Sequence, residues 1–160
     1  MEIIKVGMAD LQVGKNPCML TTLGLGSCVG ISLYCRLTKI AGMAHIMLPS
    51  SKQAHDSTNI AKFADTGIID LVNRMIGLGA TRSSLIAKLA GGAQMFAFKE
   101  TSWSMRIGDR NIEASREMLS MIRIPIIAED VGAQFGRTIE LYSNDGSLLI
   151  KTIGHGVKTI

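Results

Sequence analysis

Apolar residues alternate with polar ones, or run continuously, in short segments of the N-terminal third of the chain. Val29–Cys35 carries its larger apolar side chains at alternate positions, as expected for a strand with one face toward a core. Ala41–Leu48 is apolar on both faces, which is typical of a buried strand, and Pro49 ends it. With Ile3–Met8 and Cys18–Leu23, these segments predict that the chain begins with consecutive strands.

The middle of the chain changes to the period of a helix. Apolar residues recur at i, i+3, i+4 and i+7 spacing over Ile60–Ile76, and Ser57 or Thr58 is available as the N-cap. A second helix is predicted over Ile112–Ile122, with Asp109 near its start. Both patterns give one apolar face, so each helix is expected to pack against a sheet.

Strands return after the first helix. Leu85–Ala90 and Ile124–Ala128 read as strands, and Arg137–Tyr142 pairs with Ser147–Ile153 as a hairpin across the Asp-Gly step in Ser143–Gly146. The chain therefore contains about seven strands and two helices, without the regular strand–helix alternation of a parallel doubly wound sheet. This order predicts an α+β fold with two packed β-sheets, helices covering one of them, in a single domain over residues 1–160.

Composition agrees with a folded chain and excludes several classes. The 160 residues are 47% hydrophobic and 19% charged, with a mean hydropathy of +0.28, which excludes a disordered chain. No apolar run is long enough to cross a bilayer, and the N-terminus lacks the layout of a signal peptide, so no membrane insertion is expected. Three cysteines without an export signal are expected to be free thiols, and the expected location is the cytoplasm.

The charge of the chain says less about its partners. Seventeen basic and thirteen acidic residues give a net charge of +4, and the basic residues are scattered. Aromatic residues make up only 4% of the chain, which is poor material for stacking on single-stranded nucleic acid. No nucleic acid partner is therefore expected, whereas a mild positive charge is compatible with docking on an acidic protein.

The glycine-rich segment Thr21–Gly30 is the most unusual in the sequence. Its glycines are spaced one residue too far for the dinucleotide fingerprint, and a strand rather than a helix follows, so a phosphate cradle is disfavoured. A nucleophile turn fits better, because Cys28 enters a strand from a loop whose glycines leave backbone amides open. A thiol needs a nearby base, and His45 reaches Cys28 if the two adjacent strands pair antiparallel.

A structural interpretation of the same residues stays open at this point. A lone cysteine in a strand is usually a small inert hydrophobe, and a histidine between Ala44 and Ile46 is usually a hydrogen-bonded core residue. Metal binding is disfavoured, because the cysteines form no C-x-x-C pair and the remaining histidines lie in polar, isolated segments. The pair Glu129-Asp130 is either an acid pair or a solvated strand end.

The sequence contains five distinctive blocks: Thr22–Cys28, Ala44–Pro49, Ala90–Phe96, Ile107–Asn111 and Ala128–Gly132. Together they resemble one protein family, the chemoreceptor glutamine deamidases called CheD. The resemblance runs in order over nearly the whole chain, and the first two blocks together are specific. Ala133 departs from the pattern, because a second glycine is expected after Gly132.

The resemblance implies an α/β/β sandwich like that of the cytotoxic necrotising factor deamidases, and it implies site residues. Cys28 would be the nucleophile, His45 the base and Thr22 the residue that orients the imidazole. The loop amides around Gly26 and Ser27 would bind the oxyanion, as such donors do in acyl transfer. Thiol and imidazole supply nucleophile, base and acid, so no metal or cofactor is expected.

The resemblance also implies a substrate and a partner. The substrate would be Gln side chains on the cytoplasmic helices of methyl-accepting chemotaxis receptors, which are converted to Glu for adaptation. The CheC phosphatase would be a binding partner. Two alternatives remain: a hydrolase that also cleaves Glu methyl esters at Cys28, and a non-enzymatic interaction module that works by binding CheC or receptors.

Overall fold

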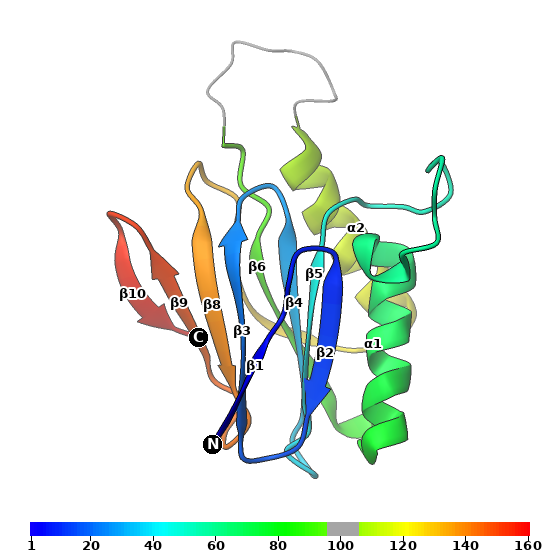
Figure 1. The fold of residues 1–160 in the computed structure, drawn as a ribbon, viewed down its shortest axis with the longest axis vertical. Coiled ribbons are helices and arrows are strands. Elements are labelled where there is room, and N and C mark those ends of the chain that lie inside the picture. The colour runs from blue at the N-terminus through cyan, green and yellow to red at the C-terminus, as the bar shows by residue number, and fades with distance from the viewer. Residues whose placement is uncertain (96–105) are drawn as a thin grey trace.

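Two β-sheets pack face to face, and two helices cover the outer face of one sheet (Figure 1). The computed structural model describes residues 1–95 and 106–160. Phe96, the last residue of one family-like block, lies outside the described residues. The prediction of an α+β fold with helices on one of two packed sheets is confirmed.

Each sheet has five strands among the described residues. Sheet A has the order β1-β3-β8-β9-β10, with strands Glu2–Lys5, Cys18–Leu25, Arg137–Tyr142, Leu148–Thr152 and Gly156–Thr159. Sheet B has the order β2-β5-β4-β6-β7, with strands Asp10–Gly14, Ala41–Ile46, Val29–Cys35, Leu85–Gly91 and Ile126–Val131. The helices are α1 (Ala64–Leu78) and α2 (Ile107–Met121), and short 3-10 helices lie at Ile60–Lys62 and Arg82–Ser84.

The alternation predicted for β4 separates two cores. Val29, Ile31 and Leu33 face the helices and belong to the core between sheet B and the helices. Tyr34 faces the other way and belongs to the core between the two sheets, which also contains Cys28. Gly30 lies on this inner face, where an added Cβ would stand 2.6 Å from Ile139 Cδ1 of sheet A. The two sheets therefore touch closely at the beginning of β4.

The N-terminal segment differs from the prediction of one strand over Ile3–Met8. β1 ends at Lys5, the chain turns with Ala9 at a positive φ of 55°, and β2 begins at Asp10 in the other sheet. The Asp10 carboxylate accepts a hydrogen bond from the Gly7 amide at 3.1 Å and stabilises this turn. The segment therefore bridges the two sheets.

The first helix begins later than predicted. Phe63 is extended and fully buried, and it separates the 3-10 turn Ile60–Lys62 from α1. The expected caps, Ser57 and Thr58, are not used; Asn59 caps the 3-10 turn and α1 has no side-chain cap.

The C-terminal half holds two further differences. β7 spans Ile126–Val131 instead of Ile124–Ala128, and β10 was not predicted because all four of its residues are exposed. The hairpin of β8 and β9 is confirmed. Ala133, the departure from the family pattern, has a positive φ of 61°, a conformation that glycine adopts at lower cost.

Candidate active site

Cys28 lies at the end of the loop that joins β3 of sheet A to β4 of sheet B (Figure 1). Gly24 has a positive φ of 67°, and the Gly26 amide donates to the Gly24 carbonyl at 3.0 Å, so the loop is tightly turned. The Cys28 side chain belongs to the core between the sheets and is 8% exposed. The nucleophile candidate is therefore buried but still open to solvent.

His45 reaches the same place through the register of sheet B. β4 and β5 pair antiparallel, which meets the condition under which His45 was expected to reach Cys28, and Gly30 is directly opposite His45. Cys28 lies two residues before Gly30, so its side chain is on the same face of the sheet as the imidazole and diagonal to it. Gly30 has no side chain to separate them.

Thr22 comes from the opposite sheet and contacts the imidazole. Its Oγ1 lies 2.7 Å from His45 Nδ1, and it also donates to the Val6 carbonyl at 2.8 Å. Neighbouring Thr21 turns away, and its hydroxyl donates to the Ile139 carbonyl at 2.9 Å. The structure therefore brings Thr22, and not Thr21, to His45.

These hydrogen bonds fix the tautomer of His45. A hydroxyl has one proton, and the Val6 carbonyl can only accept, so Thr22 gives its proton to Val6. Thr22 must then accept from His45, which places the imidazole proton on Nδ1. His45 Nε2 is left as a bare, buried nitrogen without a hydrogen-bond partner among the residues that the structure describes. This is the nitrogen that a general base uses.

Burial sets the charge of the pair at rest. Desolvation raises the pKa of the Cys28 thiol above its ordinary value, and an amide hydrogen bond offsets this only partly. Desolvation lowers the pKa of His45 below its ordinary value. Near neutral pH the pair is therefore a neutral thiol and a neutral imidazole, not a preformed ion pair.

The backbone around Cys28 is held from the β6 side. The Cys28 carbonyl accepts from the Gly92 amide, and the Gly26 carbonyl accepts from the Ala93 amide, both at 2.8 Å. Gly91 has a φ of 105°, and a Cβ there would collide with the Cys28 carbonyl oxygen. This contact explains why β6 ends with a glycine at position 91.

The loop amides are not equally available to a ligand. The Gly26 N–H is already bonded to Gly24, which differs from the expectation that amides around Gly26 are open. Ser27 and Cys28 lie between β3 and β4, and no backbone carbonyl of residues 1–95 and 106–160 accepts a hydrogen bond from either N–H group. The N–H groups of Ser27 and Cys28 are therefore the candidate oxyanion donors, and the Cys28 N–H also lies against its own sulfur.

The other cysteines and histidines lie elsewhere. Cys18 and Cys35 are buried free thiols, and His155 stacks on Phe135 with ring centroids 4.3 Å apart. In the part of the chain that the structure describes, no cluster of three or more metal-ligating side chains is present. These residues do not join the site.

Glu129-Asp130 is not a free acid pair. Glu129 is bound by Arg116, and Asp130 by Arg137 at 3.0 Å and Lys158 at 2.7 Å. Both carboxylates are therefore part of ion pairs on β7.

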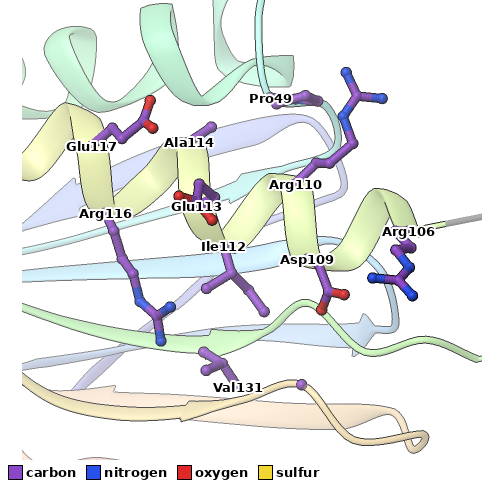
Figure 2. Close-up of a pocket in the computed structure, with 11 residues that line it drawn as sticks. Pro49, Arg106, Asp109, Arg110, Ile112, Glu113, Ala114, Arg116, Glu117 and Val131 are labelled. Carbon is purple, nitrogen blue, oxygen red and sulfur yellow. The ribbon is translucent and has the colours of Figure 1, made fainter. Parts of the chain in front are cut away.

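A groove of about 840 Å³ lies along α2 (Figure 2), and neither Cys28 nor His45 lines it. Its floor is formed by Ile112 and Val131, and charged side chains of α2 surround it, among them Arg110 and Glu113. None of the residues that carry the thiol, imidazole or open amides lines it. The groove is therefore a separate surface feature.

Sequence reasoning did not assign a role to Asn111 of α2. Its Nδ2 donates to the carbonyls of Ser27 and Met47, both at 2.9 Å, on either side of the site. The signal was present: Asn111 lies on the helix face of Ile112 and Ser115, so its amide had to be buried. Val6 was also missed, because a backbone carbonyl has no sequence signature.

Solved structures share the fold. A hypothetical protein of Bacillus licheniformis, YfiH, matches with a TM-score of 0.50 at 14% identity, over 78% of this chain and 51% of that one. The Neisseria meningitidis protein NMB0706, of the DUF152 family, matches with a TM-score of 0.51 at 8% identity, over 83% and 64%. At these identities the likeness concerns the fold alone.

In the described residues, no helix is both long and apolar enough to cross a membrane.

Comparison with curated proteins identifies close relatives. Two proteins carry the name "probable chemoreceptor glutamine deamidase CheD". That of Lachnoclostridium phytofermentans is 57% identical over 99% of both chains, and that of Caldanaerobacter subterraneus is 58% identical over 99% of this chain and 98% of its own. The family model described as CheD chemotactic sensory transduction matches residues 47–152, a span that begins just after His45. The chain therefore belongs to the CheD family.

Proposed function

We propose that this chain deamidates Gln side chains of methyl-accepting chemotaxis receptors to Glu through a thioester on Cys28. The names of its relatives support receptor glutamine deamidation in chemotaxis as the activity. The observation that carries the mechanism is the bare, buried Nε2 of His45, on the face of sheet B that Cys28 shares.

The first step is attack of sulfur on the carboxamide carbon. His45 Nε2 takes the proton of the Cys28 thiol as the C–S bond forms, because the resting pair is neutral. The carboxamide oxygen becomes an oxyanion, which the N–H groups of Ser27 and Cys28 stabilise. Loss of one such donor typically costs about 10²-fold or more in rate.

The second step releases ammonia. The imidazolium of His45 returns its Nε2 proton to the amide nitrogen, the C–N bond breaks, and the acyl group remains on Cys28 as a thioester. The Nδ1–H bond to Thr22 keeps the ring in place while its charge changes.

The third step is hydrolysis. His45 Nε2 takes a proton from water, the resulting hydroxide adds to the thioester carbon, and the C–S bond breaks. The Cys28 sulfur recovers its proton from the imidazolium, and the product is a Glu side chain. The same groups serve both halves of the reaction, and neither half requires a metal or cofactor.

The proposal includes a location and a partner. Receptor cytoplasmic helices are reached from the cytoplasm, which is where we place the protein. We also propose that the CheC phosphatase binds this chain and competes with receptors. Titration of both proteins against a receptor fragment tests this, and simultaneous binding without loss of affinity would contradict the competition.

The test of the activity uses the cytoplasmic fragment of a receptor. Incubation with the protein is expected to release ammonia and to convert specific Gln residues to Glu, mapped by mass spectrometry. Amide and methyl ester substrates assayed in parallel separate a deamidase from a broader hydrolase. If no Gln is converted while a Cys28→Ala variant keeps full cellular function, the protein is a binding module.

A further inference from the structure

Asn111 of α2 bridges the two strands that carry the nucleophile and the base. Its side chain is fully buried. Nδ2 lies 2.9 Å from the carbonyl of Ser27, which precedes Cys28, and 2.9 Å from the carbonyl of Met47, which follows His45 by two residues. One amide group thus contacts both halves of the site from the helix side of sheet B.

The chemistry of the neighbours fixes the orientation of this amide. Both partners are carbonyl oxygens, which only accept hydrogen bonds, so the end that faces them must be the NH₂ group. Asn111 Oδ1 is buried and accepts no hydrogen bond from the described part of the chain. The side chain therefore acts only as a double donor.

The bridge stands where the strand pairing stops. The β4–β5 ladder has its last pair at Val29 and Ile46. Beyond it the Met47 amide donates to the Lys62 carbonyl at 2.8 Å, outside sheet B. The side-chain amide of Asn111 connects the segment before β4 to the segment after β5, where the next backbone pair of the ladder would have stood.

The first turn of α2 is pressed against the backbone that makes this contact possible. A Cβ on Gly108 would stand 2.6 Å from the carbonyl oxygens of both Gly92 and Ala93. The amides of these two residues hold the Cys28 and Gly26 carbonyls. Asn111 lies one turn later, so the same close approach brings it within reach of Ser27.

We propose that Asn111 is a positioning residue of the deamidase, which sets the spacing between Cys28 and His45 by holding Ser27 and Met47 together. This inference rests on the proposed function. A misplacement of about 1 Å in a catalytic pair can cost about 10²-fold in rate, and beyond Val29 and Ile46 no backbone pair of the β4–β5 ladder fixes the distance between these two segments.

The matched control lies on the same helix face. Ser115 is also fully buried, and its hydroxyl donates to the Asn111 carbonyl at 2.7 Å, within α2. A Ser115→Ala variant therefore perturbs the same buried helix face without touching the strands of the site. Asn111→Leu removes both donors at similar volume, and Asn111→Ser keeps one hydroxyl donor in a smaller side chain.

The experiment measures three quantities for each variant: kcat and KM on the receptor fragment, the rate of iodoacetamide alkylation of Cys28 against pH, and Tm. Asn111→Leu is expected to lower kcat about 10²-fold, with KM changed less than about 2-fold, and Asn111→Ser to fall between it and wild type. In Asn111→Leu, the rate of Cys28 alkylation near neutral pH is expected to fall toward the rate in His45→Ala. Ser115→Ala is expected to lower Tm and to leave kcat and alkylation near wild type.

Equal losses of kcat in Asn111→Leu and Ser115→Ala at equal losses of Tm would overturn the inference. If Asn111→Leu does not fold, wild-type kcat and alkylation in Asn111→Ser would overturn it as well. A wild-type protein that deamidates nothing refutes the proposed function instead. The alkylation profile of Cys28 needs no substrate, so the two failures are distinguishable.

Discussion

Two buried cysteines lie between the sheets in different surroundings: Cys18 begins β3, and Cys28 follows the other end of β3 by three residues. At the first end, the Cys18 amide donates to Ser143 Oγ at 2.7 Å, and Ser143 Oγ donates to Asn16 at 2.8 Å. The Tyr34 hydroxyl donates to the Ser143 carbonyl at 2.9 Å. The polar groups here satisfy one another, as is usual in a protein interior.

The other end leaves hydrogen-bonding capacity unused. His45 Nε2 is buried without a partner, and the N–H groups of Ser27 and Cys28 meet no backbone carbonyl among the described residues. A buried polar group without a partner costs about 1–3 kcal/mol. The difference teaches that a cysteine in this core is a candidate nucleophile because of an unpaired base beside it, and not because of burial or a perturbed pKa. Burial raises the pKa of both Cys18 and Cys28.

The largest expected effect comes from removing the Cys28 thiol. Cys28→Ser and Cys28→Ala are each expected to abolish detectable deamidation with the fold retained, because a hydroxyl is a poorer nucleophile than a thiolate here. Cys18→Ser is the matched control and is expected to keep activity. Ammonia release and circular dichroism measure both, and a dead Cys18→Ser with an active Cys28→Ser would reverse the comparison.

Removal of the unpaired base is expected to have the next largest effect. His45→Ala should lower kcat by about 10²–10⁴-fold, with residual activity that rises with pH because hydroxide ionises Cys28. His155→Ala, at the stacked and exposed histidine, serves as the control and should be mild. Iodoacetamide that alkylates Cys28 equally fast in wild type and His45→Ala near neutral pH would show that His45 does not activate the thiol.

Loss of the hydroxyl that sets the tautomer should cost less. Thr22→Val keeps the shape but removes the acceptor for Nδ1–H, and it is expected to lower kcat about 10- to 100-fold, as for orienting partners of other histidines. Thr22→Ser should recover much of the rate. Thr21→Val, on the opposite face, should stay near wild type, and the reverse result for the two threonines would refute the assigned register.

The smallest expected effect concerns stability at acid pH. Burial lowers the pKa of His45 in the folded state, so between the folded and unfolded pKa values the unfolded chain binds more protons. The contribution of His45 to the free energy of unfolding therefore falls as the pH drops from the pKa of the unfolded state to the pKa of the folded state. The free energy of unfolding, measured with urea at several pH values between about 7 and about 5, should fall more steeply for wild type than for His45→Gln. Parallel curves would contradict the assignment.

Much of the arrangement of the candidate active site could be predicted from patterns along the chain. Apolar runs placed β4 and β5 next to each other, and antiparallel pairing then brings Cys28 and His45 to one face. The opposite orientation of Thr21 and Thr22 follows from the alternation of a strand. Because these features depend on local period and register, sequence carries them directly.

Other features depend on contacts between distant segments. β10 is fully exposed and has no apolar period, so only its pairing with β9 defines it as a strand. β2 was not predicted as a separate strand, because the sequence does not show the turn at Ala9 after which the chain passes from one sheet to the other. The occupied amide of Gly26 and the bridge made by Asn111 involve backbone atoms, whose partners no residue type reveals.

Trapping the covalent intermediate tests the central claim most directly. Wild type and Thr22→Val are each mixed with a receptor fragment in separate reactions. The reactions are quenched in acid, and the products are analysed by intact and peptide mass spectrometry. The account predicts a hydroxylamine-sensitive adduct between Cys28 and a receptor Gln, with the summed mass of both chains less one ammonia. It should accumulate at Cys28 and be absent from Cys28→Ala. Conversion of Gln to Glu by Cys28→Ala at the wild-type rate, or an adduct at Cys18, would contradict the account.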